Sequence, residues 1–394
     1  MQRELKICVV SDHFSSGPGG QHRIQNLSRG FEYLGHKVLY VSPYGASEKI
    51  SDLYIDKTFS KYSVQEYVSP YFSDFFKIFK TISTLRIKFD FLLIGLPNTM
   101  MKSLNAFYGM VKDIPVAFDF GGLHASLLDK GKVYGDIRIS IKIFRLFAQV
   151  YEDFLALSSS KLPDIITVPT TGMKNIFEKF LKRPVYVIPH PVDTVNFFNP
   201  DKYVSGRLLN ILPPQLKDKQ FIMLGIKDDP RFVTIVEEVI FNHKLQDIVF
   251  IVMGNMNKFR SAIIKKGLDK FIFFTGSRPN IEVPLYISFT KFAVALSVPE
   301  IAHVYYFPDN ISKISEYFSM GKPTITNSLG ASDYVQNGVN GFICGSFEDV
   351  VKKIVLLIDK PELAIQMGKH AREFACEKLD FRLVASKYLE YLEN

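Results

Sequence analysis

Residues 308–323 carry the most informative pattern of the chain, Pro-Asp-Asn-Ile-Ser-Lys-Ile-Ser-Glu-Tyr-Phe-Ser-Met-Gly-Lys-Pro. Apolar residues recur at helical spacing, and Asn310 or Ser312 can cap the start of a helix. Gly321 can adopt the left-handed conformation that ends a helix, and Pro323 prevents its continuation. The stretch therefore predicts a helix that stops and runs into a buried strand, an order typical of α/β proteins.

Lys313 and Glu316 stand three residues apart and so share one face of this helix. A carboxylate near a crevice can accept hydrogen bonds from both vicinal hydroxyls of a ribose. A solvent-exposed ion pair on an amphipathic helix accounts for the same two residues. The helix alone leaves both interpretations open.

Short apolar segments alternate with helical patterns along the whole chain, which predicts two parallel-sheet α/β domains. Strands are expected in the first half at 6–11, 37–42, 91–95, 115–119, 165–168 and 185–188. In the second half they are expected at 220–225, 248–253, 271–274, 292–297, 323–326 and 341–343. The proline-marked turn Pro189-His190-Pro191 separates the two halves, so we expect domains at 1–189 and 190–376, followed by a helix within 377–394.

The run from Lys313 to Phe342 resembles the donor-site segment of the retaining GT-B glycosyltransferases of family 4, written "KxxEYxxxGKPVI" followed by "G…E…NGxxG". Residues 187–193, Val-Ile-Pro-His-Pro-Val-Asp, are similar to that family's "VIPNGVD". The resemblance implies two Rossmann-like domains facing each other across a cleft, with the C-terminal helix crossing back to the first domain. It also implies a metal-independent, hexosyltransferase-like transfer from a nucleoside diphosphate sugar with retention of configuration.

The glycines of the loop 17–20 follow the first strand and precede a helix, where backbone N–H groups favour an anion. Gly19 and Gly20 could let the backbone approach the donor, although a tight turn explains them equally well. His22 holds the last place of a Gly-x-Gly-x-x-Gly pattern, so a dinucleotide dehydrogenase has little support.

Met223 to Phe232 occupy the place of the family's "GRxxxxKG", whose cations clamp the donor diphosphate. Ile226 stands in the usual Arg place and Arg231 in the usual Lys place, with Lys227 as a further candidate cation. A diphosphate needs cationic donors to bind and to stabilise the departing nucleotide. A polar turn after a strand is the alternative interpretation.

Two departures from the family pattern concern the sugar and the acceptor. Pro308 replaces the first of two family glutamates, so Asp309 or Asn310 would meet the sugar hydroxyls instead. Asp119 ends a strand and His124 follows where the family often has a histidine, although an ordinary loop histidine fits as well. The resemblance assigns catalysis to Arg231, Lys227, His124 and Asp119. It assigns donor binding to Gly19, Gly20, Gly225, Arg278, Asp309, Asn310, Ile311, Lys313 and Glu316.

Composition limits the partners of the protein. The 394 residues carry a net charge of +8, but basic residues are interleaved with Phe and Ile, and no nucleic-acid motif is present. The segments 71–89 and 137–147 mix basic and apolar residues, which fits either a core face or a peripheral membrane surface. The three dispersed cysteines, together with the lack of a spanning segment, suggest a cytoplasmic protein. The sequence contains no Asp-x-Asp triplet, which argues against a metal-dependent transferase.

The sequence thus predicts a glycosyltransferase that moves a sugar to an acceptor hydroxyl on a glycan or lipid carrier, without a metal or resident cofactor. Ile226 and Pro308 motivate a second hypothesis, a degenerate GT-B protein that serves as a binding or scaffold subunit. Another GT-B enzyme, such as a sugar-nucleotide epimerase, is a third.

Overall fold

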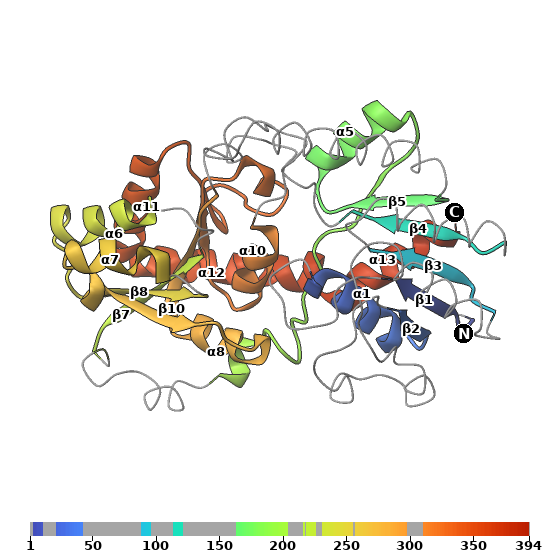
Figure 1. The fold of residues 1–394 in the computed structure, drawn as a ribbon, viewed down its shortest axis with the longest axis horizontal. Helices are drawn as coiled ribbons and strands as arrows, with labels where there is room; N and C mark the ends of the chain where they lie inside the picture. The colour runs from blue at the N-terminus through green and yellow to red at the C-terminus, as the bar shows by residue number, and fades with distance from the viewer. Residues whose placement is uncertain are drawn as a thin grey trace, which may run out of the picture. The chain divides into compact units, whose positions relative to one another are not determined.

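A computed structural model describes residues 3–10, 21–41, 88–95, 113–120, 163–203, 216, 218–225, 231–254, 257–297 and 310–393. The chain divides into two compact units. Unit 1 consists of Met1–Pro189 and Arg382–Asn394, and unit 2 of His190–Phe381. In the described residues each unit contains one six-stranded parallel sheet with helices packed on it (Figure 1).

The sheet of unit 1 has the strand order β2-β1-β3-β4-β5-β6. Its strands are β1 (Lys6–Val10), β2 (Lys37–Val41), β3 (Phe91–Ile94), β4 (Val116–Asp119), β5 (Ile165–Val168) and β6 (Tyr186–Val187). The described helices are α1 (Gln21–Tyr33), α5 (Thr171–Leu181) and α13 (Phe381–Glu393), the last beginning at the unit boundary. Leu27 and Phe31 of α1 pack with Val384 and Tyr388 of α13 against this sheet, so the two ends of the chain share one core.

The sheet of unit 2 has the order β12-β11-β10-β7-β8-β9. Its strands are β7 (Gln220–Gly225), β8 (Ile248–Met253), β9 (Ile272–Gly276), β10 (Thr290–Ala295), β11 (Thr324–Thr326) and β12 (Gly341–Ile343). Its helices are α6 (Phe232–Glu237), α7 (Asn257–Lys265), α8 (Val283–Ser288), α10 (Ile311–Ser319), α11 (Phe347–Asp359) and α12 (Pro361–Phe374). Short helical turns are η4 (Pro200–Lys202), η7 (Glu238–Asn242), η8 (Asp269–Phe271), η9 (Asn280–Glu282), η10 (Leu329–Ala331) and η11 (Ala375–Leu379).

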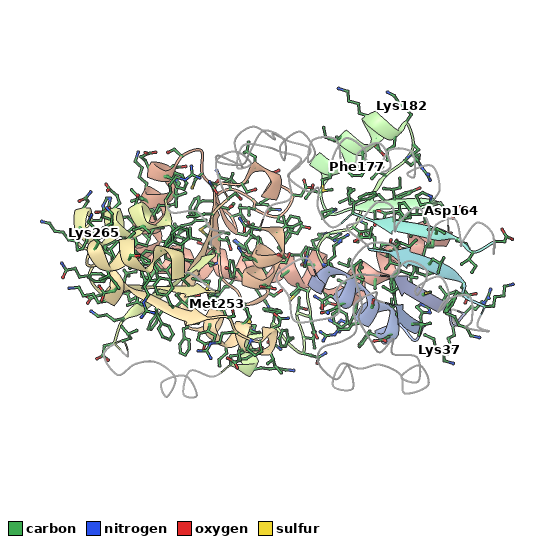
Figure 2. All side chains as sticks on the ribbon, in the orientation of Figure 1. Lys37, Asp164, Phe177, Lys182, Met253 and Lys265 are labelled. Carbon is green, nitrogen blue, oxygen red and sulfur yellow. The ribbon has the colours of Figure 1, made fainter. Side chains whose placement is uncertain are left out.

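Successive side chains of β7 enter two different cores, as the pleat of a strand requires. Ile222 and Leu224 pack with α6, α7 and α11, whereas Phe221 and Met223 pack with α8 and α10. Figure 2 shows side chains filling the space around this sheet, with Met253 at the end of β8 and Lys265 of α7 reaching away from the sheet. Helices therefore cover both faces, which leaves the ends of the strands as the place for a ligand.

The chain enters and leaves unit 2 at neighbouring points. Val192 donates its N–H to the Leu379 carbonyl at 2.8 Å and accepts from the Phe381 N–H at 3.0 Å. The Thr194 hydroxyl donates to the Asp380 carboxylate in the same place. The first and last segments of unit 2 are thus tied to each other.

The structure confirms all twelve predicted strands, with ends that differ by at most two residues. It also confirms the helix near Lys313 and the left-handed Gly321 after it, whose φ is 66°. Of the two candidate caps, Asn310 occupies the N-cap position and its carbonyl accepts the Ile314 N–H, but its backbone is left-handed and its side chain makes no cap bond; Ser312 lies inside the helix. Among the described residues, no helix is both long and apolar enough to cross a membrane.

Candidate functional site

The strand order of unit 2 places a switch point between β7 and β10. From β7 the chain adds β8 and β9 on one side and then returns to add β10, β11 and β12 on the other. Crossovers leave in opposite directions at such a point, and a crevice opens at the carboxyl ends of the two strands. Gly225 ends β7, and its carbonyl accepts the N–H of Leu296, the residue after β10, at 2.9 Å. The site is therefore built around these two strand ends.

Helix α10 lies directly against the end of β7. A Cβ atom on Gly225 would stand 2.5 Å from the Tyr317 hydroxyl oxygen and 3.2 Å from Cδ of Lys313. A side chain at this position would force Tyr317 to move and would crowd Lys313, so glycine lets α10 pack closely against the strand. The glycine predicted from the sequence is thus brought together with Lys313.

Glu316 lies on the next turn of α10 and is half-buried. Loss of surrounding water raises the pKa of its carboxyl group to about 7, and the Lys313 ammonium opposes part of that rise. Within the part of the chain that the structure describes, no group donates a hydrogen bond to this carboxylate. A ligand hydroxyl could therefore serve as its donor.

Asn310 connects α10 to the ends of β10 and β11. Its amide donates to the Ser297 hydroxyl at 3.0 Å and accepts from the Lys313 ammonium at 3.0 Å. Asn327, just after β11, accepts from the Ser297 N–H at 2.7 Å and donates to the Ser297 carbonyl at 2.9 Å. Two strand ends and one helix are held in a single polar network.

The other predicted residues of unit 2 that the structure describes lie outside this polar network. Ile311 is 3% exposed and packs in the core below α10. Arg231 precedes α6, with its guanidinium 5.0 Å from the centre of the Phe347 ring. Arg278 follows β9 at the edge of the sheet, where Nε donates to the Thr275 carbonyl at 2.8 Å. The structure therefore does not bring Arg278 to the β7 and β10 ends.

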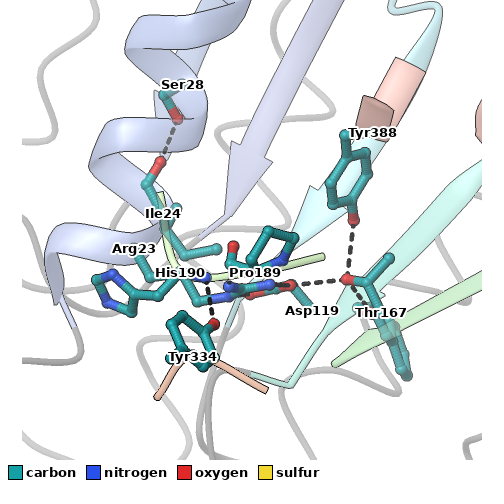
Figure 3. A network of polar contacts seen from close by, with 10 residues as sticks. Arg23, Ile24, Ser28, Asp119, Thr167, Pro189, His190, Tyr334 and Tyr388 are labelled. Carbon is teal, nitrogen blue, oxygen red and sulfur yellow. Dashed lines mark hydrogen bonds and ion pairs between the residues drawn. The ribbon is translucent and has the colours of Figure 1, made fainter. Parts of the chain in front are cut away.

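In unit 1, Asp119 ends β4 and is engaged by a cation of α1. Arg23 donates from Nε and Nη2 to the two carboxylate oxygens, at 2.8 Å each, and from Nη1 to the Pro189 carbonyl at 2.8 Å. The Thr167 hydroxyl donates to the same carboxylate at 2.7 Å, and Figure 3 shows Tyr388 beyond Thr167. Both charged side chains are 1% exposed, so they neutralise each other inside the unit.

The remaining predicted positions, Gly19, Gly20, His124, Lys227 and Asp309, lie outside the described residues, as do 71–87 and 137–147. Three further residues, Arg23, Ser297 and Asn327, were not among those predicted from the sequence. Asn327 could have been predicted, since it follows a strand at the expected carboxyl edge. Arg23 could not, because its ion-pair partner is 96 residues away in the sequence.

Comparison with known proteins adds a family match and several similar folds. Residues 230–360 match the model of the family Glycosyl transferases group 1, a range that spans α6 to α11 and includes α10. HepE of Anabaena, solved in complex with UDP, has 14% identity and a TM-score of 0.68, with 99% of this chain and 100% of that chain covered. A glycosyltransferase from Rickettsia africae has 15% identity and a TM-score of 0.72, with 98% and 97% covered.

The fold is GT-B. Sucrose-phosphate synthase from Thermosynechococcus elongatus shares this GT-B fold, at 12% identity and a TM-score of 0.72, with 99% of this chain and 98% of that chain covered. At these identities the likeness concerns the fold, whereas the family match concerns the segment that carries Lys313 and Glu316. No curated protein sequence matches the chain.

Proposed function

We propose that this GT-B protein is a glycosyltransferase that moves a sugar from a nucleoside diphosphate sugar to an acceptor hydroxyl. The observation that carries the proposal is the cluster of Gly225, Lys313 and Glu316 at the switch point of unit 2. This cluster combines close backbone approach, a cation and a carboxylate whose pKa lies near neutral pH. The group 1 match across the same segment supports it, as do the UDP complexes of the similarly folded HepE.

The proposed roles follow from the chemistry of the side chains. Glu316 accepts hydrogen bonds from ribose hydroxyls, and Lys313 and Arg231 stabilise negative charge on the diphosphate. A front-face attack assisted by the leaving phosphate would retain the anomeric configuration, as in family 4, and needs positioned cations more than a protein base. We propose that no metal or resident cofactor takes part, because lysine and arginine supply the positive charge.

A glycan or lipid-linked hydroxyl is the proposed acceptor. The basic and aromatic segments 71–89 and 137–147 support a cytoplasmic protein that binds the inner membrane face. Cosedimentation with phosphatidylserine vesicles tests this point, and equal recovery with neutral phosphatidylcholine vesicles at low salt would contradict it.

Thermal unfolding with UDP, GDP, ADP, TDP and CMP tests the donor site. A nucleotide that binds only the folded protein raises its Tm. We expect one nucleoside diphosphate to do so in the wild type and in Glu373→Ala, a control on an exposed face of α12, but not in Glu316→Ala. No shift with any of these nucleotides would contradict a working donor site.

A degenerate binding subunit is the second candidate, favoured by Ile226 and Pro308 at places where the family has charged residues. Hydrolysis of the matching nucleotide sugar separates the two. An enzyme releases the sugar slowly even without acceptor, whereas a scaffold binds the nucleotide and releases none.

A further inference from the structure

The backbone of Asn310 is unusual for a residue with a side chain. Its φ of 61° and ψ of 3° lie in the left-handed region, and the residue is 5% exposed. Asparagine and aspartate tolerate this region better than other side-chain-bearing residues, and glycine tolerates it best. Asn310 occupies the N-cap position of α10, but its side chain makes no hydrogen bond to a backbone N–H of the first turn. Other contacts must therefore hold the Asn310 side chain in place.

Those contacts fix the direction of the Asn310 amide. A lysine ammonium has donors only, so the amide oxygen must be the atom 3.0 Å from Lys313 Nζ. The amide nitrogen then faces the Ser297 hydroxyl at 3.0 Å. Ser297 is itself held by two hydrogen bonds to Asn327. The amide oxygen is therefore presented to Lys313 from a rigid support.

Lys313 is confined from the other side by the end of β7. Its Cδ lies 3.2 Å from the place of a Cβ on Gly225, so the side chain runs across the terminus of that strand. A neutral amide can orient an ammonium without cancelling its charge, whereas a carboxylate would neutralise it. The arrangement places the Lys313 ammonium at the switch point, where an anionic ligand would meet it.

We infer that Asn310 is a positioning residue, which orients Lys313 to bind the diphosphate of the donor. The inference rests on the proposed function and assigns the diphosphate of the donor to Lys313. Asn310 binds Lys313 through its amide oxygen and Ser297 through its amide nitrogen, so its substitution should weaken diphosphate binding by releasing Lys313. Aspartate at this place would keep the backbone conformation and pair with the ammonium, in competition with the ligand.

The test is a double-mutant cycle with Asn310→Asp, Asn310→Gly and Lys313→Met. Calorimetry measures the Kd of whichever of UDP, GDP, ADP or TDP stabilises the wild type, and of the matching nucleoside. We expect Asn310→Asp and Lys313→Met each to weaken diphosphate binding about tenfold or more, and Asn310→Gly to weaken it several-fold, with little change for the nucleoside. In the Lys313→Met background, the uncharged Asn310→Gly should change the Kd less than about twofold, because no ammonium is left to orient.

Ser312→Ala, in the same turn of α10, is the matched control and should bind like the wild type. Equal losses for diphosphate and nucleoside, or an unchanged effect of Asn310→Gly in the absence of Lys313, would overturn the inference while leaving the proposed function standing. If the wild type binds none of the four diphosphates, both fail. Asn310→Gly keeps the cycle informative should the aspartate variant fold poorly, because glycine accepts the same φ.

Discussion

Each unit has charged residues near the carboxyl edge of its sheet, but the two units differ in how these charges are paired. In unit 1, Arg23 and Asp119 form a bidentate ion pair that is 1% exposed, and Thr167 satisfies the carboxylate further. In unit 2, Lys313 is held by an amide and the half-buried Glu316 has a pKa near 7. Similar parallel architecture thus supports a tightly hydrogen-bonded ion pair in one place and, in the other, a lysine held by an amide and a glutamate whose pKa is raised.

The difference shows which charged residues are available to a ligand. A buried pair that satisfies itself contributes to structure, and removing one partner leaves an uncompensated charge. Charged groups that are not locked in such a bidentate pair can interact with an incoming anion or hydroxyl. A charged residue at the end of a strand is therefore not evidence of chemistry until its partners are known.

Asp119→Asn should have the largest effect on stability. It leaves the buried Arg23 without a carboxylate, and we expect a loss of about 3–5 kcal/mol in the free energy of unfolding, measured with urea. Arg3→Ala, which breaks an exposed pair with Asp90 in the same unit, should cost at most about 1 kcal/mol. If Asp119→Asn unfolded like the wild type yet lost sugar transfer, Asp119 would take part in the reaction, and the contrast between a structural pair in unit 1 and accessible charges in unit 2 would be wrong.

Gly225→Ala should lower both the stability of unit 2 and its affinity for the nucleotide. The added methyl group must displace Tyr317 or Lys313, with a cost of about 1–3 kcal/mol and roughly tenfold weaker binding of the nucleoside diphosphate. Gly345→Ala is the control, because nothing lies within 4 Å of a Cβ there. Equal binding by the two variants would show that the contact of α10 with β7 does not shape the site.

The raised pKa of Glu316 predicts two opposite trends with pH. The pKa of about 7 in the folded protein exceeds the ordinary value of 4.5, so between pH 4.5 and pH 7 the folded protein keeps a proton on Glu316 that the unfolded chain has lost. The free energy of unfolding therefore falls as the pH rises from 4.5 to 7. Nucleotide binding needs the carboxylate and should strengthen as pH rises through 7. Melting temperatures and Kd values from pH 5 to 8.5 test both trends. Glu316→Gln should flatten both, and parallel curves for variant and wild type would assign the titration elsewhere.

Arg278→Ala should have the smallest effect. Its side chain is 38% exposed at the edge strand, so we expect a change of at most about 1 kcal/mol in stability and a few-fold change in nucleotide affinity. A tenfold loss of affinity by calorimetry would extend the binding surface from the β7 and β10 ends to β9.

The strands and α10 were predictable because their signals are local. Apolar runs such as Ile248–Met253 are continuous and bounded by polar turns, and helical spacing with a glycine stop marks α10. The left-handed Asn310 and the Arg23–Asp119 pair were not predictable, since both depend on partners brought close only by folding. Lys313 and Glu316 could be placed on one face from spacing, but their different electrostatic surroundings could not.

The tie between Val192 and the Leu379–Phe381 segment has a consequence for modularity. Unit 2 is in effect inserted into unit 1 between Pro189 and Arg382, and its two attachment points lie side by side. Units with adjacent ends can be excised or exchanged without stretching the remaining chain. One donor-side module could therefore be recombined with different partners, and acceptor choice could diversify while α10 and its strand ends stay unchanged.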